Sequence, residues 1–429
     1  MTPPSGFLAP YRVLDLTDHR GLLAGRMLAQ LGADVLQIEP PEGSSARGVA
    51  PLDDSAPPGQ QSLFWAAYAS GKRGVTCDLD TPQGQALLLR LVEKADFLIE
   101  SERPGVMAAR GLAHERLLAA NPALIHVSIT PFGSTGPKAD WADTDLVLWA
   151  AGGPLLQAQD GDRPPLRISV PQAYLHAAGD AAGAALVAHF ARLRSGRGQQ
   201  VDISVQQSVA QATLSSILAA AVGHENFSLR VEPKSRTRKT LDLSGSGART
   251  RRSKWPVKDG LVEMHLAMGP AAGRFTNNLF AWIHDEGGCD AELASWDWVT
   301  LPARIEADEI TEEDLERVRD LVGRFLAPRT KAELAAIAMR RKLLLAPVAT
   351  TEDLANSPHH AERGFFRELT DAAGRTLRLP GPFAMGVPQG FVAPTPAPLP
   401  GQHDEAVWCG LVGLSADELA ECRKQGVIR

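Results

Sequence analysis

Cysteine is scarce in this sequence, with four residues among 429, and their spacing matches no metal-binding pattern. Cys77, Cys289, Cys409 and Cys422 lie far apart, which is typical of reduced thiols in a cytosolic protein and argues against a disulfide framework. Long apolar runs are lacking too, since none approaches the roughly 18 residues that a membrane-spanning helix needs. We therefore expect a cytoplasmic protein with no membrane partner, no metal site and no permanently bound cofactor.

The chain also lacks a strong excess of charge of either sign. Its formal net charge of −6 gives no indication of a nucleic-acid partner or of an anionic membrane surface. The N-terminus has no basic segment followed by an apolar one, so no secretory signal is expected. With 44% hydrophobic and 22% charged residues, the composition is that of a globular protein long enough for two domains.

Short apolar runs alternate with helical patterns in the first third of the chain. Thr81 is expected to cap a helix that has Pro82 at its first position, and similar capping signals stand at Thr311 and Thr330. Strands alternating with helices favour a parallel sheet covered on both faces, so the predicted fold class is α/β with a Rossmann-like large domain. The expected strands are residues 12–16, 35–39, 75–79, 97–100 and 125–129.

The turn after the first expected strand does not have the glycine pattern of a dinucleotide site. Residues 17–22 contain no Gly-x-Gly-x-x-Gly motif. They do contain His19 and Arg20, and a basic loop at the carboxyl end of a strand suits a ligand that carries phosphate.

A segment rich in small residues follows later in the chain. Residues 178–189 are expected to form a tightly packed helix, which ends at Ser195 with Gly196 as a left-handed cap. Residues 171–199, which end in Ser-Gly-Arg-Gly-Gln, resemble the signature of the family III CoA-transferases, the family of formyl-CoA transferase and α-methylacyl-CoA racemase. Further runs that resemble the family stand in its order: 13–17, 31–35, 38–41, 71–73, 100–106, 128–137, 345–348, 356–359, 363–366, 379–382 and 396–403.

The resemblance implies an architecture and a substrate. It implies a large α/β domain built from both ends of the chain, a smaller α+β domain between them, and two chains interlocked as a dimer. We expect residues 1–225 to form the first part of the large domain and residues 226–330 the small domain. Residues 331–429 are then a linker and the C-terminal part that returns to the large domain. Coenzyme A and its acyl thioesters are the implied substrates.

Charged and small residues stand where the family binds CoA. CoA carries a diphosphate and a 3′-phosphate, to which Arg and Lys supply charge-assisted hydrogen bonds. Each of these residues alone would fit a solvated surface charge, but as an ordered set they match the family. The residues that the resemblance implies for CoA binding are His19, Arg20, Arg47, Lys72, Arg73, Ser101, Arg103, Arg110 and Thr130.

One departure from the family bears directly on the mechanism. In the family the helix starts with an Ala-Asp pair, and that Asp is the nucleophile that takes the acyl group from the thioester. Counted back from Ser195, its position holds Tyr174. A phenol has an ordinary pKa of about 10 and would form a stable ester, so Tyr174 is a poor substitute. The racemase branch places a proton-exchanging His where this chain has Thr144, which cannot move protons near neutral pH.

Two neighbours of Tyr174 are weaker candidates for the missing nucleophile. Asp180 lies six residues farther along, about 240° around a helix, and therefore faces elsewhere. His176 is nearer, but a lone His on an Ala-rich helix is more often a core or capping residue. We therefore expect no catalytic residue in this chain.

A basic stretch runs from Lys234 to Lys258. The negative net charge of the whole chain and the lack of aromatic residues among these basic ones argue against a nucleic-acid surface there. In the family this region enters the small domain, where a Gly-rich loop moves over the active site. The resemblance thus implies a substrate loop with charges suited to CoA phosphate or a dicarboxylic acid, formed by Gly245, Gly247, Arg251 and Arg252.

Three functions remain open at this point. The favoured one is a subunit of a heteromeric CoA-transferase whose nucleophile is on a homologous partner subunit that carries the Asp. Succinyl-CoA:benzylsuccinate CoA-transferase, built from two different family members, is an enzyme of that kind. The alternatives are a self-sufficient acyl-CoA enzyme that uses another residue, and a CoA-binding or regulatory protein without catalysis.

Overall fold

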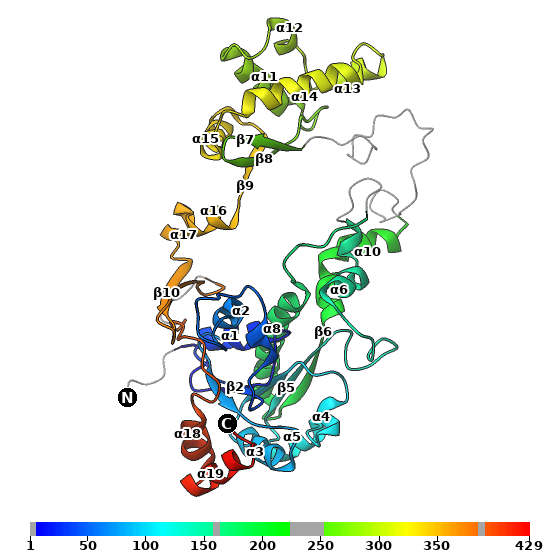
Figure 1. The fold of residues 1–429 in the computed structure, drawn as a ribbon. Coiled ribbons are helices and arrows are strands. Elements are labelled where there is room, and N and C mark those ends of the chain that lie inside the picture. Colours follow the sequence, from blue (N-terminus) through cyan, green and yellow to red (C-terminus); the bar gives the residue numbers. More distant parts are fainter. Residues whose placement is uncertain (1–5, 158–163, 224–252, 385–390) are drawn as a thin grey trace. The chain divides into compact units, whose positions relative to one another are not determined.

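The chain folds into two compact units (Figure 1). The computed structural model describes residues 6–157, 164–223, 253–384 and 391–429. Within these ranges, residues 253–360 form the small unit, and the remainder forms the large unit from both ends of the chain. The small unit thus continues past residue 330, where the sequence placed its end, through α15 (Lys331–Arg341) and β9 (Leu345–Val348).

A six-stranded sheet organises the large unit, with all neighbouring strands parallel in the order β3-β2-β1-β4-β5-β6. The inner strands β4 and β5 are buried along their whole length, because their near-continuous apolar runs are covered on both faces. The predicted α/β class with a Rossmann-like sheet is confirmed. The strands are β1 (Arg12–Asp15), β2 (Asp34–Glu39), β3 (Arg73–Thr76), β4 (Phe97–Glu100), β5 (Ile125–Thr130) and β6 (Gln199–Ser204).

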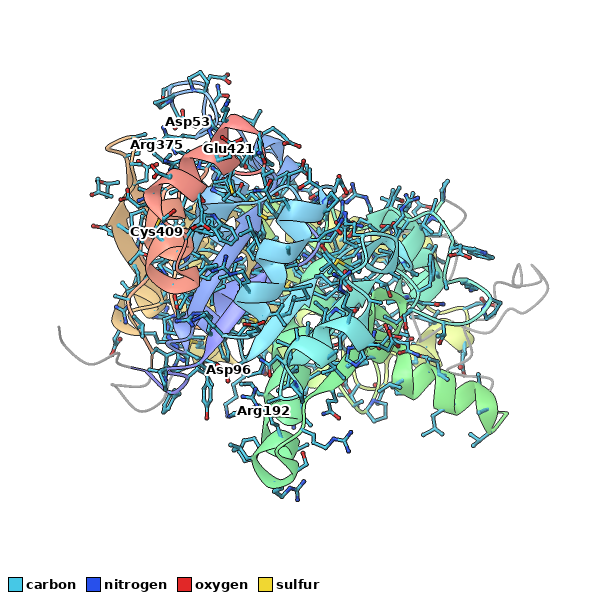
Figure 2. All side chains as sticks on the ribbon, turned by 90° about the horizontal axis from the view of Figure 1, so that it is seen from below. Asp53, Asp96, Arg192, Arg375, Cys409 and Glu421 are labelled. Carbon is cyan, nitrogen blue, oxygen red and sulfur yellow. The ribbon has the colours of Figure 1, made fainter. Side chains whose placement is uncertain are left out.

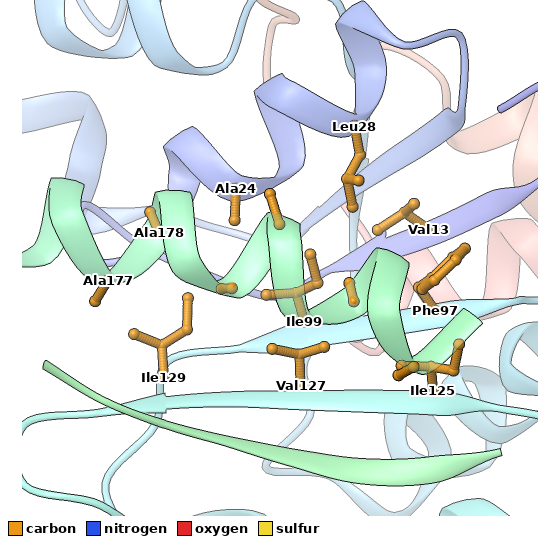
Figure 3. Close-up of a cluster of buried hydrophobic side chains, with 14 of the residues drawn as sticks. Val13, Ala24, Leu28, Phe97, Ile99, Ile125, Val127, Ile129, Ala177 and Ala178 are labelled. Atoms are coloured by element: carbon orange, nitrogen blue, oxygen red, sulfur yellow. The ribbon is translucent and has the colours of Figure 1, made fainter. Parts of the chain in front are cut away.

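Helix α8 (Ala173–Ser195) packs against one face of this sheet together with α1 (Leu22–Gln30) (Figure 3). Its buried face is almost entirely alanine, from Ala173 to Ala188, which lets the helix approach α1 and the strands closely. The helix ends as predicted at Gly196, whose φ of 70° is left-handed.

The junction of α8 with β6 is fixed by two further contacts. Arg192 donates to Asp96 Oδ1 at 3.2 Å near the start of β4 (Figure 2). Gly198 leads into β6 so closely past β5 that a Cβ there would lie 1.9 Å from the carbonyl oxygen of Leu124. Only glycine fits at this approach.

The C-terminal segment covers the other face of the sheet. Trp408 and Ile428 belong to the same buried cluster as Leu36 and Leu98. Other helices of the large unit are α2 (Leu63–Tyr68), α3 (Pro82–Val92), α4 (Val106–Ala109), α5 (His114–Ala120), α6 (Asp145–Gly152), α7 (Pro154–Gln157), α9 (Val205–Ala210), α10 (Leu214–Ala221), α18 (Asp404–Val407) and α19 (Ala416–Lys424). A hairpin of β10 (Phe366–Thr370) and β11 (Thr376–Pro380) also belongs to it.

The small unit is of the α+β type. Its antiparallel sheet has the order β7-β8-β9, with β7 (Lys254–Val257) and β8 (Gly260–Met264). Its core is aromatic, with Trp255, Trp282 and Trp298 fully buried. Its other helices are α11 (Gly273–Asp285), α12 (Ala291–Ala294), α13 (Leu301–Glu306), α14 (Glu312–Leu326) and α16 (Thr351–Ala355), and α17 (Pro358–Glu362) stands where the chain returns to the large unit. Among the described residues, no helix is long and apolar enough to cross a bilayer.

Candidate functional site

The loops that follow β1 and β4 meet at the carboxyl edge of the large sheet. The strand order runs outward from these two neighbours in opposite directions, which is where open α/β sheets bind ligands. Ser101, directly after β4, donates its hydroxyl proton to Asp18 Oδ1 at 3.2 Å and accepts the backbone N–H of Asp18 at 3.3 Å. The sequence analysis had identified Ser101 but not Asp18.

Asp18 holds the basic pair that follows β1. Arg20 donates from Nε to both carboxylate oxygens of Asp18, at 2.9 and 3.1 Å, and His19 Nδ1 lies 3.6 Å from Oδ2. Burial alone would raise the pKa of Asp18, but the hydrogen bonds and charge of Arg20 outweigh it and lower that pKa. The Arg20 guanidinium is therefore neutralised locally, while the exposed His19 ring faces solvent.

The loop after β4 carries the next expected residues. Arg110 donates to Glu102 Oε1 at 2.7 Å and to Asp80 Oδ1 at 2.6 Å, and its charge is thereby paired. Arg103 is exposed and forms no ion pair within the described part of the chain. On the next strand, Thr130 has a buried hydroxyl without a hydrogen-bond partner among the described residues. Arg103 and Thr130 are thus the expected residues with unused hydrogen-bonding capacity.

Tyr174 lies in the first turn of α8, beside these loops. Its hydroxyl donates to Asp143 Oδ2 at 2.7 Å. Burial, the hydrogen bond to Asp143 and the negative charge of Asp143 raise the pKa of Tyr174 far above its ordinary value, and the nearby charge of Arg20 offsets only part of this. These contacts favour the protonated form of the phenol, which is a weak nucleophile.

The N-terminus of α8 is capped by the same segment that contains Asp143. Asp145 Oδ1 accepts the backbone N–H groups of Gln172 and Ala173 at 2.7 and 2.8 Å, which caps the helix. Thr144 between them caps α6 by accepting the N–H of Val147. Thr144 is thus a structural residue here, as its lack of proton-transfer chemistry suggests.

Three residues expected at CoA are held by internal contacts instead. Lys72 is fully buried, and its ammonium donates to Asp15 Oδ2 at 2.7 Å, to Leu22 O at 2.9 Å and to Gln37 Oε1 at 2.9 Å. All three of its protons are used in these contacts, so Lys72 has none left for a phosphate in this structure.

The two arginines of this group are paired as well. Arg73 forms two hydrogen bonds to Asp34, the first residue of β2, and this places its guanidinium toward the amino edge of the sheet, away from the loops after β1 and β4. Arg47 binds both carboxylate oxygens of Glu39 and the carbonyl oxygen of Pro398, and stacks on Trp65. Both contacts are structural ion pairs, so neither residue presents a free charge to a ligand in this structure.

The two weaker nucleophile candidates face other partners. Asp180 accepts a hydrogen bond from Gln211 at 3.1 Å. His176 is exposed and packs edge-on against Trp149, with ring centroids 6.0 Å apart. The expected substrate-loop residues Gly245, Gly247, Arg251 and Arg252 lie outside the described residues.

Two features of the site were missed by the sequence analysis. Asp143 stands in a run of polar residues whose partners depend on the tertiary fold, and nothing in its sequence context identifies it. Asp18 lies three residues after the end of β1, so its place in a carboxyl-edge loop was a usable signal. Within the described ranges no group of three or more His, Cys, Asp or Glu side chains is arranged to hold a metal ion.

The sequence of this chain is similar to those of known CoA-transferases. The family model described as CoA-transferase family III matches residues 8–404. The subunit BbsE of succinyl-CoA:(R)-benzylsuccinate CoA-transferase from Thauera aromatica is 32% identical over 415 residues, 95% of this chain and 96% of that protein. Succinyl-CoA–D-citramalate CoA-transferase from Chloroflexus aurantiacus is 30% identical over 424 residues, 97% of each chain.

A solved structure is similar along the whole fold. The crystal structure of a CAIB/BAIF family protein from Brucella suis matches with a TM-score of 0.75, 24% identity, and coverage of 95% of this chain and 100% of that chain. At this identity the likeness supports the fold alone.

Proposed function

Because the chain belongs to CoA-transferase family III, we propose that it is the subunit of a heteromeric transferase that does not attack the thioester. The enzyme would move CoA between an acyl-CoA and a dicarboxylic acid, and a homologous partner subunit would supply the nucleophilic Asp. One observation carries this proposal: the nucleophile position holds Tyr174, a buried phenol bonded to Asp143 and held in its protonated form.

The relatives support both parts of the proposal. One is named as a subunit of an enzyme for which succinyl-CoA is a substrate, and another is named as a succinyl-CoA-dependent transferase. We therefore propose a dicarboxylic acid as the CoA acceptor and a second, unlike subunit as the partner, in line with the names of these relatives. The CoA-contacting surface proposed for this chain is reduced to the loops after β1, β4 and β5, namely His19, Arg20, Ser101, Arg103 and Thr130, with Arg110 fixing the second loop.

Apolar side chains on the surface of the large unit support the proposal of an interlocked dimer. On α8, Val187 and Phe190 are each 71% exposed and Leu193 is 63% exposed. Apolar groups of this size, lying side by side on one helix, mark an interaction surface rather than a surface that faces water. Further exposed apolar residues follow on and after α10: Leu214, Ile217, Leu218 and Val222.

The test is a transfer assay on this chain alone and together with a family member that has Asp at the helix start. Native mass spectrometry first establishes whether the two chains assemble. Succinyl-CoA is then supplied with a panel of dicarboxylic acids, and new CoA esters are identified by mass. We expect transfer only by the mixed complex, and its loss when the partner's helix-start Asp is changed to Asn. Turnover by this chain alone would overturn the proposal.

A further inference from the structure

The part of the site beside Tyr174 carries negative charge that the proposed reaction does not use. Asp143 is placed there by its contact with the phenol, and its own neighbours fix it further, because Asp145 binds the start of α8 and Thr144 caps α6. Its carboxylate therefore has a defined position at the outer end of the Tyr174 side chain.

The charges around Tyr174 do not cancel this carboxylate. Asp18 and Asp143 both act on the phenol as negative charges, and Arg20 is the opposing cation among the described residues. Arg20 is itself bound to both oxygens of Asp18 and lies in the field of Glu102. Arg110, which binds Glu102, is shared with Asp80. Within the described part of the chain, Asp18, Glu102 and Asp80 are thus paired with cations, whereas Asp143 is bonded only to the phenol.

An acyl group directed at this helix start would come to lie beside Asp143. This step rests on the proposed function, in which residue 174 occupies the position of the acyl-accepting nucleophile. The phenol of residue 174 donates a hydrogen bond to Asp143 Oδ2 at 2.7 Å. A second carboxylate brought to the same place, such as the free end of a succinyl group, would be repelled. The repulsion is appreciable because like charges in a partly buried site are screened less than in water.

We infer that Asp143 is a specificity-determining residue that makes the start of α8 in this chain reject acyl groups ending in a carboxylate. Neutral acyl groups of similar size meet no such repulsion. The dicarboxylic acid then reacts only at the partner's site, and this chain takes free CoA or CoA esters of neutral acids.

The experiment compares two thioesters that differ in one charge. Dissociation constants of propionyl-CoA and succinyl-CoA are measured by calorimetry on the full chain, on Asp143→Asn and on Tyr174→Phe. The unaltered chain is expected to bind propionyl-CoA about tenfold more tightly than succinyl-CoA, with the ratio falling as ionic strength rises. Asp143→Asn keeps a hydrogen-bond acceptor for the phenol but removes the charge, and should bring the two constants within about twofold.

Tyr174→Phe is the matched control, because it removes the hydrogen bond and leaves the charge of Asp143. It should preserve the preference for propionyl-CoA. Equal affinities in the unaltered chain, an unchanged preference in Asp143→Asn, or no binding of either thioester would each overturn the inference. The transfer assay on the mixed complex does not depend on the ratio of the two dissociation constants. If the binding experiment contradicts the role of Asp143, the proposed function still stands. If the mixed complex shows no transfer, the proposed function fails, and the transfer assay alone reveals this.

Discussion

The ammonium group of Lys72 is enclosed inside the large unit, where three acceptors take its three protons. Asp15 is equally buried, and its second oxygen accepts from the backbone and hydroxyl of Thr17. The pair packs so closely against α1 that a Cβ on Gly25 would lie 1.9 Å from Asp15 Oδ2. Burial lowers the pKa of Lys72 and the charge of Asp15 opposes that shift, so each charge depends on the other.

Removing one partner of this buried pair should therefore be costly. Lys72→Met leaves the carboxylate of Asp15 buried without its counter-ion, and we expect the free energy of unfolding of the large unit to fall by about 3–5 kcal/mol. The matched change Arg73→Gln breaks a half-exposed pair with Asp34 and should cost about 1 kcal/mol or less. Urea titrations followed by circular dichroism measure both. Equal midpoints for the two variants would contradict the structural role given to Lys72.

Adjacent motif residues can have unlike roles, and this limited the prediction of the site. Lys72 and Arg73 are neighbours in a motif that predicts phosphate binding, yet the structure uses both for internal ion pairs. Their partners Asp15 and Asp34 are 57 and 39 residues away in the chain. A sequence motif specifies which residue type stands at each backbone position. Where the end of a long side chain lies depends on those distant partners, which a single sequence does not reveal.

At the scale of single elements, α5 and β5 each contribute one histidine to a stacked pair. The rings of His114 and His126 are 5.4 Å apart and inclined by 27°, with their Nδ1 atoms separated by 3.2 Å. One nitrogen must donate and the other accept, so the contact is lost when both rings are protonated. Glu100 lies 3.7 Å from His126 on the sheet side, and Glu115 acts on His114 from α5.

This pair predicts a pH dependence of stability whose sign is fixed. Burial and the neighbouring His126 lower the pKa of His114, and Glu115 offsets only part of the shift. The unfolded chain then binds more protons than the folded chain once the pH falls below about 6.5. The contribution of His114 to the free energy of unfolding should be fully present above about pH 6.5 and should decrease as the pH falls toward the lowered pKa of His114. His114→Asn should flatten this decline in thermal melts between pH 7 and 5, and an unchanged slope would remove His114 as its cause.

Elements that are fixed by local patterns were predicted well from the sequence. The capping signals at Thr81, Thr311 and Thr330 are confirmed, since each side chain accepts a backbone N–H in the first turn of its helix. Four of the five expected strands are found within one residue of their expected bounds, because apolar runs mark strands buried inside the sheet. The strand expected at 75–79 is displaced, since β3 covers Arg73–Thr76. The small unit was harder to delimit, because its continuation to His360 depends on packing between elements and not on any change in composition.

At the scale of the whole molecule, an unpaired apolar row on α8 predicts association. Val187, Phe190 and Leu193 follow one another at about one helical turn, while the opposite face of α8 is buried against the sheet. Phe190→Glu puts a charge in the middle of this row, which an apolar partner surface cannot solvate. We expect that variant to shift the protein, alone or with its partner subunit, to a lower mass in multi-angle light scattering.

The matched control for this prediction is Arg197→Glu, which changes the charge at an exposed position just beyond Gly196, the residue that ends α8. If that change lowers the mass as much as Phe190→Glu does, the association is electrostatic and the apolar row is not its cause. If Phe190→Glu leaves the mass unchanged while the fold is intact by circular dichroism, the interlocked assembly is wrong for this chain. A mass lowered by Phe190→Glu alone would place the shared surface on α8. That helix starts at Tyr174, so contact with the partner would then be made along the element that bears the altered nucleophile position.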